Sequence, residues 1–134
     1  MLNERCKPNP GAVFSLKYHL VWCPEYRKEV LTGSVETRLN ALLSEKAHHM
    51  GAMIHARDVM PNHVHMIVES DPTKAPAHIA AQFKGFTSRV LRQAFLHLKM
   101  SMPCLWSHSD SIGSVGHVSD ATVRRFIALQ QERG

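Results

Sequence analysis

Apolar and polar residues alternate from Val13 to Cys23, a period of two that predicts a half-buried β-strand. One side of this strand would carry the apolar residues Phe14, Leu16, Tyr18, Leu20 and Trp22. The other side would carry Ser15, Lys17 and His19. Pro24 is predicted to end the strand, and the basic loop Tyr26-Arg27-Lys28 follows it.

Two longer segments show the 3.6-residue spacing of amphipathic helices. Ser34 is predicted to cap the first helix, and Gly51 to end it. Its apolar stripe is Val35, Leu39, Leu42, Leu43 and Ala47. The second helix is predicted from Ala75 to about Leu98, with an apolar stripe of Ile79, Phe83, Phe86, Val90, Ala94 and Leu98. Between the helices, residues 52–60 and His63–Ser70 are predicted to form a hairpin around the turn Pro61-Asn62.

Residues 111–118 favour a fourth strand weakly, and Ser119-Asp120 would cap a last helix that runs to about Gln131. The resulting order is βαββαβ plus a terminal helix. It predicts an α+β, ferredoxin-like fold, in which two helices cover one face of a four-stranded antiparallel sheet. We expect one domain over residues 1–134, with a flexible lead-in over 1–10 and the terminal helix over 119–133.

Composition narrows the class of protein. The chain has 134 residues with 44% hydrophobic and 20% charged residues, which is typical of one globular domain. Apolar runs are too short to cross a membrane and residues 1–11 lack a secretory apolar run, so we expect a cytoplasmic protein. Three cysteines without a CxxC pair predict neither a disulfide framework nor a cysteine-rich zinc site. The formal net charge of +5 favours a polyanionic partner.

The most informative segment carries two histidines, His63 and His65, on one predicted strand. Residues two apart point to the same side, so both imidazoles would project about 7 Å apart from the face that the helices leave open. Two neutral imidazoles can share one divalent cation. The bland alternative is a pair of solvated histidines that bind nothing.

With Met60-Pro61-Asn62 in front of it, His63-Val64-His65 resembles the HUH motif of the single-tyrosine insertion-sequence transposases. Other segments resemble that family in the same order over roughly residues 13–131. They are Tyr18–Pro24 with Tyr26-Arg27-Lys28, Phe83-Lys84-Gly85 through Ser88-Arg89, Leu105-Trp106-Ser107, and Ser114-Val115-Gly116.

The resemblance implies a small endonuclease that cuts and rejoins single-stranded DNA at the ends of a mobile element and recognises hairpins there. It implies that His63, His65 and Gln130 hold Mg²⁺ or Mn²⁺ against the scissile phosphate. It also implies a tyrosine nucleophile that forms a 5′-phosphotyrosine, and a homodimer in which the terminal helix can reach the partner's histidines. The resemblance implies no membrane partner.

The sequence departs from the family at the nucleophile. Aligned on Val123-Arg124-Arg125, the tyrosine position falls on Phe126, which has no hydroxyl to attack phosphorus, whereas Gln130 is present. Three explanations remain open: an engineered Tyr-to-Phe variant, a natural member that binds without cleaving, or a wrong register with Phe126 in the core. The first two predict a cleavage-dead chain, and we favour the first because the metal ligands are intact.

Basic and polar residues would contact DNA phosphates: Lys17, His19, Arg27, Lys28, Lys84, Ser88, Arg89 and Arg92. Unpaired bases could stack on an aromatic ring, but the sequence does not show which one. The rival hypothesis is a non-catalytic nucleic-acid-binding module, because ferredoxin-like sheets also bind RNA. Against it, the third predicted strand carries the histidine pair instead of an RNP-type aromatic run.

Overall fold

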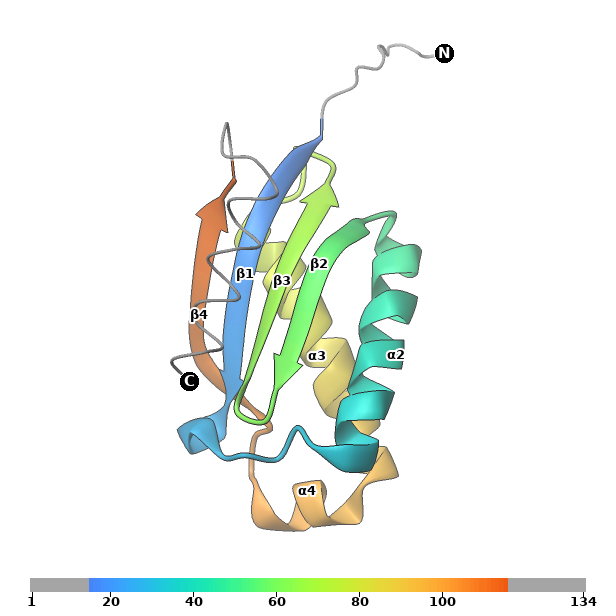
Figure 1. Cartoon of the computed structure of the whole chain (residues 1–134), viewed down its shortest axis with the longest axis vertical. Coiled ribbons are helices and arrows are strands. Elements are labelled where there is room, and N and C mark those ends of the chain that lie inside the picture. Colours follow the sequence, from blue (N-terminus) through green and yellow to red (C-terminus); the bar gives the residue numbers. More distant parts are fainter. Residues whose placement is uncertain (1–14, 116–134) are drawn as a thin grey trace.

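The computed structural model describes residues 15–115. Figure 1 shows their helices and strands along the chain. Strand β1 spans Leu16–Pro24 and is followed by the short 3₁₀ turn η1, Glu25–Arg27. Helix α2 spans Gly33–Met50, and the hairpin strands are β2, Met53–Met60, and β3, His63–Ser70. The remaining elements are α3, Pro76–Ala94, α4, Leu96–Ser101, and β4, Trp106–Ser114.

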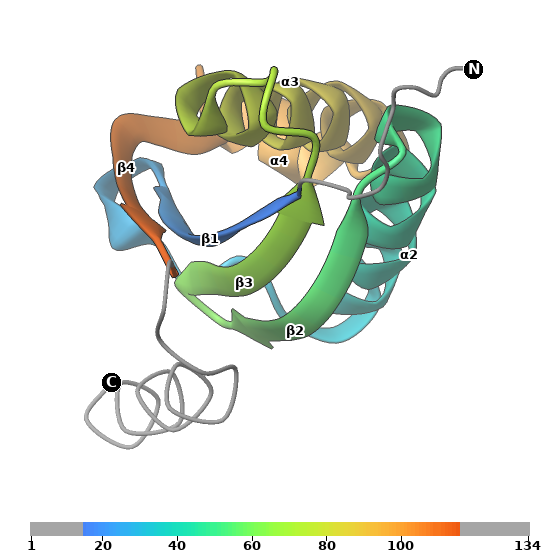
Figure 2. The same ribbon diagram turned by 90° about the horizontal axis from the view of Figure 1, so that it is seen from above.

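The four strands form one antiparallel sheet in the order β2-β3-β1-β4. Helices α2 and α3 cover the same face of this sheet, as the view in Figure 2 shows. The predicted α+β, ferredoxin-like class is therefore confirmed. Among residues 15–115, no helix is both long and apolar enough to cross a membrane.

The core lies between the sheet and these helices. All five residues of the predicted α2 stripe are buried, and so are Tyr18, Leu20 and Trp22 on β1. The indole of Trp22 stacks on Phe83 of α3 at 6.3 Å between ring centroids. Alternation on the strands and the 3.6-residue period on the first helix thus identified the correct buried faces.

Three predicted boundaries are wrong. Helix α2 begins one residue before Ser34, after an extended Thr32, so Ser34 lies inside the helix rather than capping it. The second helix does not continue to Leu98. It stops at Ala94, because Phe95 adopts extended angles (φ −124°, ψ 100°) and α4 starts anew. This break turns the chain so that Leu98 and Met102 return to the core.

The third error concerns the last strand, which begins at Trp106 rather than Ser111. Its first half, Ser107–Asp110, is polar and partly exposed at the sheet edge, so no apolar alternation marks it. The strand is defined instead by its pairing with β1, in which Trp106 lies opposite Pro24 and Ser114 lies opposite Tyr18. The predicted lead-in over 1–10 and the terminal helix over 119–133 lie outside the described residues, so both stay predictions.

Candidate metal and nucleic-acid site

His63 and His65 lie on the sheet face opposite α2 and α3. His65 pairs with Val21 of β1 and with Asp58 of β2, while the intervening Val64 belongs to the core under the helices. The pair is not exposed, however. Only 6% of His63 and 4% of His65 are accessible, so they are not the solvated histidines of the bland alternative. On the same face Ile67 is fully buried and packs with Val115, so this surface is partly apolar.

The two rings are close, with centroids 4.5 Å apart and planes inclined by 65°. Nδ1 of His63 lies 2.7 Å from Oδ1 of Asn62. An amide oxygen only accepts hydrogen bonds, so this contact assigns the proton to Nδ1 and leaves the lone pair on Nε2. Within the described part of the chain, Nε2 of His63 and Nδ1 of His65 are buried with no hydrogen-bond partner.

Electrostatics favour the neutral form of both rings. Burial lowers the pKa of His63, the positive charge of Arg27 lowers it further, and Asp58 opposes the shift. For His65, burial and the neighbouring His63 and His19 lower the pKa to about 4, again against Asp58. Two imidazoles with low pKa values keep their lone pairs at neutral pH, which is the state that binds a metal ion.

Asp58 is a site residue that the sequence reasoning missed. It lies directly across the hairpin from His65 and acts electrostatically on both histidines. Directly opposed residues on antiparallel strands share a face. Counting back through the two-residue turn Pro61-Asn62 would have found it, because that turn sets the register of the hairpin.

The predicted DNA-contact residues fall into two groups, and the first lies near the histidine pair. His19 is half-buried on the same face, with its ring centroid 6.2 Å from that of His65, and burial lowers its pKa. Lys17 lies farther along β1, directly opposite Glu69 of β3 in the strand register. Arg27 and Lys28 are exposed where the chain leaves β1, at the same end of the sheet as the β2–β3 turn (Figure 1).

The second group lies on α3, across the sheet from the histidines (Figure 2). Lys84 donates to Asp110 at 2.6 Å and to the carbonyl of Ser107 at 2.8 Å, so it joins α3 to β4. Arg92 donates to the carbonyl of Met102 at 3.1 Å. Ser88 is half-buried, and Arg89 is exposed beside the ring of Phe86. One strand of DNA cannot contact both groups without passing around an edge of the sheet.

No three His, Cys, Asp or Glu side chains between residues 15 and 115 are arranged to hold a metal ion. The histidine pair therefore needs a further ligand from elsewhere. Gln130, which the resemblance supplies for that role, and Phe126 both lie outside the described residues. Their places relative to the pair stay predictions.

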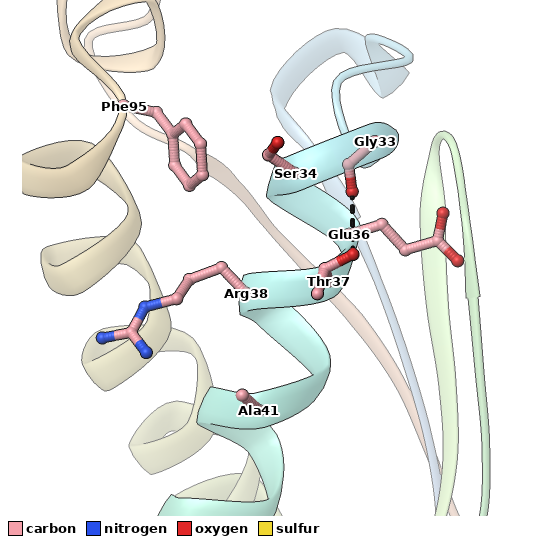
Figure 3. Close-up of a pocket in the computed structure, with 7 residues that line it drawn as sticks. All are labelled: Gly33, Ser34, Glu36, Thr37, Arg38, Ala41 and Phe95. Atoms are coloured by element: carbon pink, nitrogen blue, oxygen red, sulfur yellow. Dashed lines mark hydrogen bonds between the residues drawn. The ribbon is translucent and has the colours of Figure 1, made fainter.

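A separate hollow lies at the start of α2, where Gly33, Ser34 and Arg38 face Phe95 across a gap (Figure 3). The hydroxyl of Thr37 donates to the carbonyl of Gly33 at 3.2 Å and is thereby occupied. Every residue that lines this hollow comes from α2 or from the α3–α4 junction. It therefore belongs to the helical layer and not to the histidine face.

Comparison with known proteins agrees with the geometry. The model of the family described as "Transposase IS200 like" matches residues 12–130. The ISDra2 transposase TnpA of Deinococcus radiodurans is 32% identical over 129 residues, which cover 95% of this chain and 92% of that protein. The transposase for insertion sequence element IS200 of Salmonella typhimurium is 24% identical over 89% of this chain and 79% of its own length.

Solved structures show the same fold. A Deinococcus radiodurans R1 protein assigned as a transposase superposes with a TM-score of 0.74 at 31% identity, covering 92% of this chain and 97% of its own. A REP-associated tyrosine transposase bound to a REP hairpin superposes with a TM-score of 0.55 at 14% identity, over 83% of this chain and 61% of that one.

The ferredoxin-like sheet carries a histidine pair on the face opposite its helices. Together with the family match, this fold places the chain in the class of small DNA transposases. The chain belongs to the IS200-like transposase family, whose members are DNA strand transferases.

Proposed function

We propose that the chain binds hairpin-bearing single-stranded DNA at the ends of an insertion sequence and holds a divalent cation, Mg²⁺ or Mn²⁺, beside one backbone phosphate. The observation that carries this proposal is the buried pair His63 and His65, neutral and with lone pairs that the described residues leave unused. The solved relative bound to a REP hairpin supports the hairpin as the DNA partner.

The donor set fits such a cation. The ligands would be His63, His65 and Gln130, two imidazoles and one amide oxygen, a set that suits Mn²⁺ and tolerates Mg²⁺. When bound, the ion supplies Lewis-acid stabilisation of charge on the phosphate oxygens. Asn62 orients His63 by fixing its tautomer, and Asp58 adds the negative charge that the two neutral rings lack.

The chain's own residues would bind and position the DNA strand. Arg27 and Lys28 lie where the backbone leaves β1 and would neutralise phosphates that flank the site. In the family's reaction a tyrosine oxygen attacks phosphorus, a phosphotyrosine forms at the 5′ end, and a 3′-hydroxyl leaves. The phosphotyrosine link retains the energy of the broken phosphodiester bond, so the strand can be rejoined without ATP. Phe126 in place of that tyrosine would leave binding intact and prevent cleavage.

The rival proposal is a binding module without any metal-dependent chemistry. The buried, paired placement of the histidines favours the transposase, because a module that only binds RNA has no need for desolvated neutral imidazoles. We also propose a homodimer, as the resemblance implies, which would bring two such sites to the two ends of one element.

Binding to a DNA hairpin with a single-stranded flank should depend steeply on salt. If about six phosphates are neutralised, affinity should fall by about 300-fold between about 50 and 200 mM salt. Fluorescence anisotropy at several salt concentrations measures the slope. Salt-insensitive binding, or equal affinity for a blunt duplex, would contradict the proposed DNA partner.

The two groups of basic residues can be separated in the same assay. Arg27→Ala with Lys28→Ala should make the salt slope shallower by about 0.7 per lost phosphate contact. Arg89→Ala, on the other side of the sheet, is the matched control. An effect confined to Arg89→Ala would move the DNA path to the helical face.

Asp58→Asn should weaken Mn²⁺ binding about three- to tenfold, because it removes a negative charge near the cation without changing the shape of the side chain. Isothermal titration calorimetry without DNA measures the change directly. Asp110→Asn, which removes a carboxylate that pairs with Lys84, is the control for a general effect of charge. Unchanged affinity for Mn²⁺ would remove Asp58 from the site.

A further inference from the structure

Tyr26 lies in a turn whose backbone is unusual. Tyr26 (φ 60°, ψ 18°) and Arg27 (φ 54°) both adopt the left-handed region, which costs energy for residues with a Cβ atom. The described residues contain no other non-glycine residue with positive φ. Two adjacent strained residues persist only where the surrounding structure holds them, and such strain is typical of functional sites.

The surrounding backbone holds this turn in place. The amide of Glu25 donates to the carbonyl of Leu105 at 2.8 Å, and Leu105 is itself buried in the core. The amide of Lys28 donates back to the carbonyl of Glu25 at 3.3 Å. The turn is therefore anchored at its base, and its strained tip presents Tyr26 in a defined direction.

The ring of Tyr26 serves no packing role, since 82% of the residue is exposed, the largest exposed fraction among the described large hydrophobic residues. Its neighbours Arg27 and Lys28 are exposed cations. An exposed aromatic ring beside cations is the arrangement with which proteins hold single-stranded nucleic acid, because the ring stacks on a base and the cations follow the backbone.

The turn also lies next to the histidine pair. Trp22 pairs with Val64, so the chain leaves β1 at the level of His63, and η1 begins at Glu25. The amide of Leu31, in the segment after this turn, donates to the carbonyl of Pro61 at 3.0 Å, so that segment is tied to the β2–β3 turn that precedes His63. A nucleotide whose phosphate lies at the histidines would have its neighbouring bases within reach of this turn.

We propose that Tyr26 is a nucleobase-stacking residue that receives one unpaired base of the single strand beside the phosphate held at His63 and His65. The inference rests on the proposed function and adds a base subsite to it. The contact uses the face of the ring and not the hydroxyl, so a purine or pyrimidine is accepted through its π-face and no covalent step is involved.

The test couples a protein change to a DNA change. The full chain is titrated with a DNA hairpin that carries a single-stranded flank of about ten thymidines, close to the site size of such proteins. A series of probes carries one abasic site at each flank position in turn. Wild type, Tyr26→Leu and Tyr26→Phe are compared in the presence of Mn²⁺, and circular dichroism checks that each variant is folded.

We expect wild type to lose about tenfold in affinity at one abasic position, as for the loss of one stacked base. Tyr26→Leu should bind the intact flank about tenfold more weakly and be insensitive to an abasic site at that same position. Tyr26→Phe should behave as wild type. Binding by wild type with no such coupling, or equal defects in Tyr26→Phe and Tyr26→Leu, overturns the stacking role alone. If wild type binds none of these DNAs at low salt, the proposed function and the stacking role both fail.

Discussion

Phe126→Tyr is expected to convert a chain that binds DNA into one that cuts it. The variant should form a covalent protein–DNA adduct through a 5′-phosphotyrosine and release a free 3′-hydroxyl end, in a reaction that requires Mn²⁺ or Mg²⁺. Loss of a covalent nucleophile costs on the order of 10⁶ in rate. The restored hydroxyl should therefore turn an undetectable reaction into an easily measured one, read as a shifted band on a denaturing gel.

The double variant Phe126→Tyr with His65→Ala is the matched control and should form no adduct. Hairpin substrates taken from both ends of the insertion sequence should be tried, because cleavage depends on the flanking strand. If the single variant forms no adduct with any of them while still binding, Phe126 does not occupy the nucleophile position. The non-catalytic binding module would then be the better description.

Removal of one histidine should abolish metal binding. His63→Ala deletes the ring whose Nε2 is buried and oriented by Asn62, and we expect the affinity for Mn²⁺ to fall by more than about 100-fold. Calorimetry or electron paramagnetic resonance of Mn²⁺ measures the loss. The effect should be the same for His65→Ala, since two neighbouring rings act as one site.

His78→Ala is a suitable control, because His78 is exposed on α3, on the other side of the sheet. His63 is buried, so a thermal melt should show that the variant is folded, and His63→Gln provides a substitution of more similar volume. Undiminished Mn²⁺ binding in folded His63→Ala and His65→Ala proteins would refute the proposed metal site.

The hairpin that carries the histidines was predicted to within one residue. His63–Ser70 and the turn Pro61-Asn62 agree with the structure because the turn chemistry and the alternation around it are both local signals. The buried stripe of α2, from Val35 to Ala47, was predicted for the same reason. The end of α3 at Ala94 was not, because the apolar spacing continues to Leu98 and no local signal marks the extended Phe95 at which the helix stops.

For the candidate site, too, local sequence patterns predicted one part and the tertiary structure alone revealed the rest. The amino-acid sequence by itself determined that His63 and His65 share one side of a strand, since a period of two is a property of the chain. Only the tertiary structure decided that they are buried, that Asp58 faces them, and that Lys84 and Arg92 lie across the sheet. It also decided that the strained turn at Tyr26 lies at the same end of the sheet as the β2–β3 turn before His63. Burial, charge and strain depend on residues distant in sequence that pairing and packing bring together, and no local pattern records them.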